Sequence, residues 1–128
     1  RLEMLPKQHT VLDWMVPAPA QGALLVTALE SNTDLLTPLS PLNDDETALC
    51  VAQERMFLSE LEGGCTAPIG ALAKIEGDQI HFVGNITQKG GKEQLVFDQY
   101  MPLEDAQGIG SIAAKKLLSQ GAKALLNG

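Results

Sequence analysis

Three short stretches in which apolar residues alternate, joined by glycine turns, constrain the fold of this chain most strongly. They are residues 68–76, 79–87 and 93–101, and each places alternate apolar side chains on one face of a strand. Gly77 with Asp78, and the sequence KGGK, separate them and are typical of hairpin turns. Consecutive strands joined by hairpins pair antiparallel, so the pattern predicts a three-stranded antiparallel meander.

Helices are predicted before and after this meander in the sequence. Residues 44–62 have Asn43 as the predicted N-cap, Glu46 at the capping-box position and Gly63 as the stop. A second helix is predicted over residues 105–120, and AKALLN favours a last helical turn. The side chains predicted to face the core or a neighbour are Leu49, Val51, Ala52, Met56, Leu58, Leu61, Ile109, Ile112, Ala113 and Leu117. Together these elements predict an α+β fold, with the helices packed on one face of the sheet.

The first 42 residues are predicted to be extended and irregular. Within them GALLVTAL, residues 22–29, is a continuous apolar run that is typical of a strand buried on both faces. Such a strand needs partner strands on either side of it. TPLSPL, residues 37–42, is predicted to be a linker. Because the sequence begins with Arg1, we expect it to be a piece of a longer protein.

Composition and charge exclude several classes of protein. The longest uncharged apolar run is interrupted by two prolines and a glycine, so we expect neither a membrane span nor a signal peptide. A net charge of −7 argues against nucleic acid. Cys50 and Cys65 do not have CxxC spacing, and His9 and His81 are the only histidines, so no metal site is expected. A reducing, cytoplasmic location is expected.

Cys65 follows two glycines, Gly63 and Gly64, at a helix end. The helix dipole and the nearby Glu62 disfavour a thiolate, so we expect an ordinary protonated thiol. Such a thiol can still add to a very reactive electrophile or hold an attached group, and glycines let a bulky adduct approach the main chain. The plainer interpretation is a glycine cap followed by a small buried cysteine, and for Cys50 it is core packing.

Three segments in the same order, PAPAQGAL, NDDETALCVAQER and FLSELEGGCTAPIGALA, resemble the porphobilinogen deaminase (hydroxymethylbilane synthase) family. The resemblance covers essentially the whole chain but only the C-terminal part of that family. It implies that residues 1–16 end the second domain and that residues 17–42 form the hinge and the return strand of the first domain. Residues 43–128 then form the C-terminal cofactor-attachment domain.

The resemblance also implies a chemistry for Cys65. The family joins four porphobilinogen molecules, with loss of ammonia, on a dipyrromethane cofactor that a thioether links to the cysteine of EGGC, here Cys65 beside Gly63 and Gly64. Loss of ammonia generates an azafulvene-type electrophile, which suits an unactivated thiol. By the same resemblance Arg1 and Gln21 are candidates for substrate binding. The plainer interpretation of each is a solvated or hinge-packing residue.

A growing polypyrrole carries two carboxylates per ring and needs many cations. This chain has only two arginines, Arg1 and Arg55, so we expect that it cannot hold such a substrate alone. The resemblance implies that the family's catalytic aspartate and most of its arginines belong to its N-terminal part, so we expect this chain alone to be inactive. The parent enzyme is expected to be a monomer, whereas this chain can self-associate through its unpaired strand. Two alternatives stay open, namely a free-standing α+β interaction module without catalysis and a small thiol enzyme or redox sensor.

Overall fold

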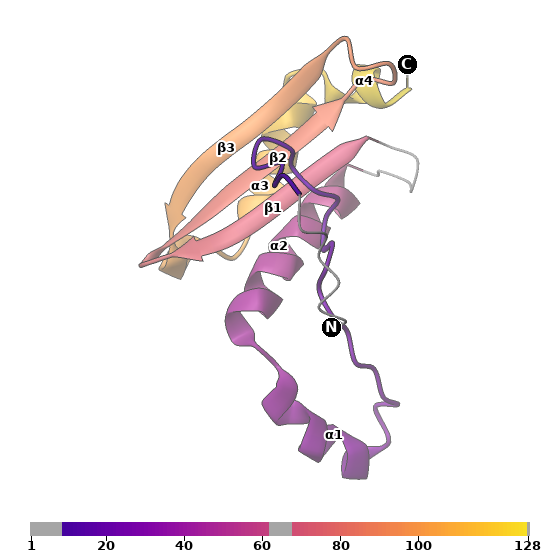
Figure 1. The fold of residues 1–128 in the computed structure, drawn as a ribbon, viewed down its shortest axis with the longest axis vertical. Helices are drawn as coiled ribbons and strands as arrows, with labels where there is room; N and C mark the ends of the chain where they lie inside the picture. Colours follow the sequence, from indigo (N-terminus) through magenta and orange to yellow (C-terminus); the bar gives the residue numbers. More distant parts are fainter. Residues whose placement is uncertain (1–8, 62–67, 128) are drawn as a thin grey trace.

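An antiparallel sheet of three strands, in the order β1-β2-β3, lies in the upper half of the molecule as drawn in Figure 1. The computed structural model describes residues 9–61 and 68–127. The strands are β1 (Ile69–Glu76), β2 (Gln79–Thr87) and β3 (Gln94–Pro102). The helices are α1 (Thr33–Leu39), α2 (Asp45–Glu60), α3 (Ile109–Ser119) and α4 (Ala122–Asn127), with 3-10 turns at Ser40–Leu42 and Leu103–Asp105.

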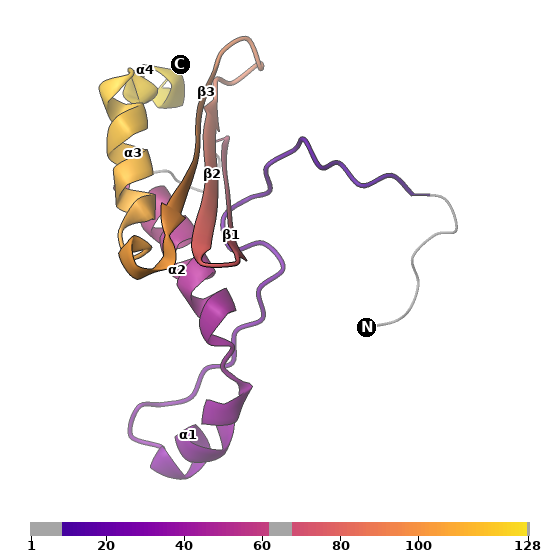
Figure 2. The ribbon, with the colours of Figure 1, turned by 90° about the vertical axis from the view of Figure 1, so that its left-hand side faces the viewer.

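Helices α2, α3 and α4 lie on one side of the sheet, and the N-terminal segment lies on the other (Figure 2). This arrangement confirms the predicted α+β fold and the antiparallel meander. The first hairpin pairs Glu76 with Gln79 around Gly77, whose φ of +66° suits a glycine. The second hairpin pairs Thr87 with Gln94 around the KGGK turn.

Alternate residues of β2 form the centre of the core. Ile80, Phe82 and Ile86 are fully buried against the helices, as is Phe57 of α2. The rings of Phe57 and Phe82 meet edge to face, with their centroids 5.6 Å apart. Gly84 makes this possible, because a Cβ at that position would lie 2.8 Å from Cζ of Phe57. The glycine in β2 therefore provides the space into which the α2 aromatic packs.

The predicted start of α2 is wrong by one residue. Asp44 is the N-cap, since its side chain accepts a hydrogen bond from the Thr47 N–H at 2.7 Å. Asn43 instead donates from its side chain to Asp45 at 2.6 Å. Glu46 therefore stands in the first turn and outside the capping-box position. The predicted stop, Gly63, lies outside the described residues.

The predicted apolar faces of α2 are confirmed in part, since Leu61 is buried and Leu49 and Leu58 pack against the core. Ala52 is exposed and Met56 is 37% exposed. The helix buries Gln53, Glu54 and Phe57 instead. Gln53 and Glu54 can be buried because each side chain accepts hydrogen bonds from backbone N–H groups of other segments.

Helix α3 follows its prediction more closely. Ile109, Ala113 and Leu117 are buried as expected, and Gly121 ends the helix with a φ of +97°. Ile112 is exposed, which corrects the prediction. The helix instead crosses close to α2 along its small residues, where Gly110 and Ala114 are buried.

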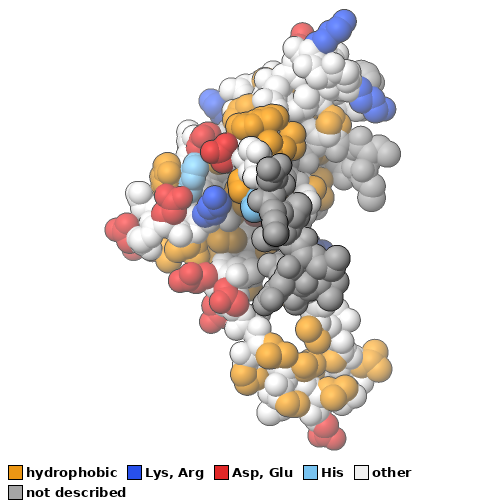
Figure 3. Space-filling view, viewed as in Figure 1, with side chains coloured by type: hydrophobic (Ala, Val, Ile, Leu, Met, Phe, Trp, Pro, Cys, Tyr) orange, Lys and Arg blue, Asp and Glu red, His pale blue; other side chains and the backbone are white. Residues whose placement is uncertain are grey.

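Residues 22–29 form no strand in the described structure, contrary to prediction. Leu24 is 96% exposed and Leu25 and Leu29 are also exposed, since no described strand lies beside them to complete a sheet. Residues 37–42, predicted as a linker, are helical, because α1 is capped by the Asn32 side chain and runs on into a 3-10 turn. Figure 3 shows apolar side chains gathered at the end of the molecule that carries α1. Nowhere in the described ranges does a helix combine the length and apolar character needed to cross a membrane.

Candidate functional site

Of the predicted site residues, only Gln21 belongs to the described part of the chain. Cys65, Gly63, Gly64 and Arg1 lie outside the described residues. The site is therefore built from the elements that precede and follow Cys65 in the sequence. These are the end of α2 and the beginning of β1.

Both of these elements are firmly anchored next to the segment that contains Cys65. Leu61, the C-cap of α2, is buried in the core. On the other side the carbonyl of Pro68 accepts a hydrogen bond from the Thr87 N–H at 2.9 Å. The Gly70 N–H donates to the Asn85 side chain at 3.0 Å. Residues 62–67 thus join two points that the core and β2 hold in place.

The outer edge of β1 is covered by the N-terminal segment and by α2. The Ala71 N–H donates to the carbonyl of Pro17 at 2.9 Å, and the Ala73 N–H donates to Oε1 of Glu54 at 2.8 Å. Gly70 permits this approach, because a Cβ there would lie 2.9 Å from the carbonyl oxygen of Val16. An edge strand covered in this way is protected against pairing with another chain.

Gln21 lies in a tight turn formed by residues 17–22. Its side-chain oxygen accepts a hydrogen bond from the Ala18 N–H at 3.2 Å, and its own N–H donates to the Ala18 carbonyl at 3.1 Å. Ala20, in the same turn, has a φ of +61°, and its N–H donates to Oε2 of Glu54 at 2.6 Å. Gln21 is exposed and stabilises the turn. A role in substrate binding stays a prediction.

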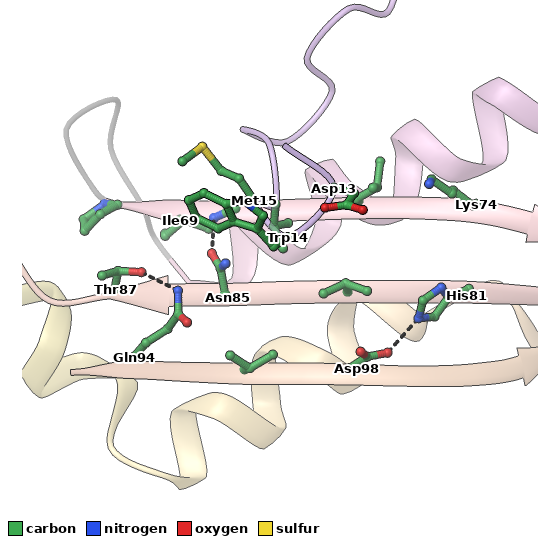
Figure 4. A pocket seen from close by; sticks show the side chains of 16 residues that line it. Asp13, Trp14, Met15, Ile69, Lys74, His81, Asn85, Thr87, Gln94 and Asp98 are labelled. Carbon is green, nitrogen blue, oxygen red and sulfur yellow. Dashed lines mark hydrogen bonds and ion pairs between the residues drawn. The ribbon is translucent and has the colours of Figure 1, made fainter. Parts of the chain in front are cut away.

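A groove of about 730 Å³ runs over the face of the sheet that the helices leave open. Figure 4 shows Trp14 and Met15 lying over its β1 side, with Lys74 and His81 further along. Nε2 of His81 lies 2.6 Å from the Asp98 carboxylate. Among the described residues that line the groove, Lys74 is the single lysine, and there is no arginine. The groove therefore offers little positive charge to a ligand with several carboxylates.

A second hollow of about 620 Å³ separates the turn of residues 17–22 from α2 and β1, and Cys50 lines it. Burial raises the pKa of the Cys50 thiol, and the negative charge of Glu54 adds to this effect. A backbone hydrogen bond from Ile75 acts in the opposite direction. Cys50 is also packed against the core, in agreement with its predicted packing role. It is therefore a weak nucleophile at neutral pH.

Sequence reasoning missed two residues of this region, Gln53 and Glu54. Oε1 of Gln53 accepts hydrogen bonds from the N–H groups of Gly108 at 2.9 Å and Gly110 at 3.4 Å, at the start of α3. Only the run of three polar residues Gln53, Glu54 and Arg55 in an otherwise apolar stretch could have indicated this. Within residues 9–61 and 68–127, no cluster of three or more His, Cys, Asp or Glu side chains is placed to hold a metal ion.

Comparison with known proteins identifies a family that this chain matches. Residues 48–119 match the model of the family described as "Porphobilinogen deaminase, C-terminal domain". A porphobilinogen deaminase of Roseiflexus sp. (strain RS-1) is 37% identical over 116 residues, which is 91% of this chain and 38% of the relative. Its counterpart in Methylobacillus flagellatus is 39% identical over 114 residues, 89% of this chain and 37% of the relative. The chain thus spans somewhat more than a third of the length of these relatives.

Proposed function

This chain belongs to the porphobilinogen deaminase family and contains its C-terminal domain, and we propose that it carries the cofactor of such an enzyme. The enzyme deaminates porphobilinogen and joins four molecules into hydroxymethylbilane, a step in tetrapyrrole biosynthesis. In this proposal Cys65 holds a dipyrromethane cofactor through a thioether. Residues 17–42 form the hinge and the return strand of the first domain.

The observation that carries the proposal is that the family match runs through Cys65, and that the chain on both sides of this residue is anchored. Leu61 is buried at the end of α2, and Pro68 is hydrogen-bonded to β2 before β1 begins. A covalent cofactor needs an attachment point whose position is fixed relative to a rigid scaffold. The other thiol, Cys50, is a poor candidate because it is packed against the core and its pKa is raised.

The residues of this chain fit the thioether better than they fit the cofactor's carboxylates. When bound, the cofactor supplies the pyrrole carbon on which the product grows. Loss of ammonia from a porphobilinogen unit gives an azafulvene electrophile. The Cys65 thiol would add to its exocyclic carbon to form the carbon–sulfur bond, and the thiol proton would pass to the pyrrole nitrogen. The two arginines and the single groove lysine cannot neutralise two carboxylates on every ring. In this proposal those charges are met by the part of the enzyme that this chain does not include.

The proposal is tested by joining this chain to the N-terminal portion of the Roseiflexus relative, in place of the matched C-terminal residues. Three forms of this fusion protein are compared by intact mass after denaturation. They are the unsubstituted fusion protein, called the parent below, and its Cys65→Ser and Cys50→Ser variants. We expect a dipyrromethane adduct on the parent and on Cys50→Ser, and none on Cys65→Ser. An adduct on both cysteine variants, or none on the parent, would contradict the proposal.

The same measurement separates the alternative functions. An unmodified parent that folds normally supports an interaction module, and a sulfenic acid or mixed disulfide on Cys65 supports a thiol enzyme or redox sensor. The chain alone, incubated with porphobilinogen, is expected to keep Cys65 as a free thiol and to form no product. We expect this because the chain has few cations and, in this proposal, does not include the catalytic aspartate.

A further inference from the structure

Glu54 is a buried carboxylate in the middle of α2, with only 6% of its surface exposed. Each of its two oxygens accepts one backbone hydrogen bond, Oε2 from Ala20 at 2.6 Å and Oε1 from Ala73 at 2.8 Å. An ionised carboxylate accepts but does not donate, so it matches two N–H groups that point at it from two sides. Such charge-assisted bonds are stronger than those between neutral groups.

These two bonds join three segments that are far apart in the sequence. Ala20 is 34 residues from Glu54, and Ala73 is 19 residues from it. The first belongs to the turn of residues 17–22, and the second lies in the middle of β1. One side chain of α2 therefore holds the turn against the outer edge of β1.

The turn itself needs such a restraint. Ala20 has a φ of +61°, a left-handed conformation that a residue with a Cβ adopts only at an energetic cost. Besides Glu54, the bond between the Pro17 carbonyl and the Ala71 N–H ties this turn to β1. The exposed side chain of Gln21 bonds only within the turn among the contacts described for it.

We infer that Glu54 is a latch that makes the turn of residues 17–22 part of the C-terminal domain. The predicted hinge then bends after this turn, in the exposed stretch of residues 23–32, and the turn moves together with α2 and β1. This inference rests on the proposed function only in assigning residues 17–42 to a hinge. The latch itself is a property of this chain and can be measured without any cofactor.

The experiment uses Trp14, the only tryptophan of the chain, as a reporter. Trp14 is 72% exposed and lies three residues before Pro17, so its motion reports whether the segment stays attached to the sheet. Time-resolved fluorescence anisotropy of Trp14 and amide hydrogen exchange are measured for Glu54→Gln and Glu54→Ala. Glu46→Gln and Glu46→Ala are the controls, because Glu46 is exposed on the first turn of the same helix.

We expect Glu54→Ala to add a fast component to the anisotropy decay of Trp14. Amide exchange at Ala20 and Ala73 should accelerate by about tenfold or more, because each amide loses one hydrogen bond to the carboxylate. Exchange of the β2 amides should stay unchanged. Glu54→Gln keeps the shape of the side chain and one acceptor oxygen, so it should accelerate one of the two amides while preserving the fold. The Glu46 variants should match the parent in both measurements.

Two results would overturn the inference. If Ala73 exchanges faster while Ala20 and Trp14 behave as in the parent, Glu54 only caps the strand edge. If β2 and α3 amides accelerate as much as Ala20, the substitution acts through general stability. Neither result touches the proposed function, which depends on the adduct at Cys65, and a missing adduct would leave the latch measurements valid.

Discussion

For the substitution Gly110→Ala, helix propensity predicts a gain in stability, whereas the tertiary structure predicts a loss. Gly110 lies in the first turn of α3 and faces the backbone of α2. Propensity alone predicts that alanine stabilises a helix by up to about 1 kcal/mol relative to glycine. In this structure, however, the added Cβ would overlap the carbonyl oxygen of Gln53, and it would lie 3.1 Å from the backbone nitrogen of Phe57.

The size of the stability loss depends on how far α3 must move away from α2. The obstacle is helix backbone, which cannot rotate away as a side chain can, so α3 must shift outward by about 1 Å to restore ordinary contact. Overpacking of this kind costs about 1–3 kcal/mol, and weakening the hydrogen bond from Gly108 to Gln53 adds about 1 kcal/mol. After the propensity gain is subtracted, we expect a net loss of about 2 kcal/mol, or about 6–10 °C in Tm.

Urea unfolding followed by circular dichroism at 222 nm measures this loss. A double-mutant cycle with Gln53→Ala tests the mechanism, because Gly110→Ala should already have weakened the bond that Gln53→Ala removes. The combined loss is then smaller than the sum of the separate losses. A Gly110→Ala protein as stable as the parent, or a strictly additive cycle, would refute the close crossing of α2 and α3.

Three further predictions concern the caps, the thiols and the exposed segment. The pKa of Asp44 lies below its ordinary value of 3.8 because the Thr47 N–H, and next the Thr47 side chain, bond to its carboxylate. Asp44→Ala should therefore be less stable than the parent at pH 7. The difference should shrink as the pH falls below 3.8 and through the lowered pKa, and urea midpoints across this range measure it. In a Cys65→Ser background, iodoacetamide should alkylate Cys50 at pH 8 more slowly in the native protein than in urea, and equal rates would argue against its raised pKa. Light scattering over a concentration series should show association through residues 17–42, and a monomer at every concentration would contradict this.

The sheet was predictable because its signals are local. Alternation identifies each strand, and glycine turns set the register of its hairpins, so neither depends on knowing the rest of the fold. The strands predicted at 68–76, 79–87 and 93–101 agree with the observed ones to within one residue at each end. The α2 helix was predictable for the same reason, apart from the choice between Asn43 and Asp44 as its cap.

The buried face of α2 was not predictable, because periodicity counts only apolar residues. Gln53 and Glu54 are buried since each meets backbone N–H groups of segments that are distant in the sequence. The position of those N–H groups is a property of the folded structure. Cys65 was singled out through its neighbours in the sequence and the family resemblance, and its proposed role stays a prediction.

The distribution of buried residues explains why one part of this chain forms a core and another does not. Every buried apolar side chain of the described residues lies between Phe57 and Ala122. Helix α1 buries none of its residues, and Leu24, Leu25 and Val26 are exposed although they are as apolar as the core. Apolar residues are buried only where other elements offer a complementary surface, and the outer edge of β1 is already occupied by Pro17 and Glu54. Because Pro17 and Glu54 already bond to the outer edge of β1, residues 22–29 do not pair there in the described structure, and we expect them to pair with a strand outside this chain.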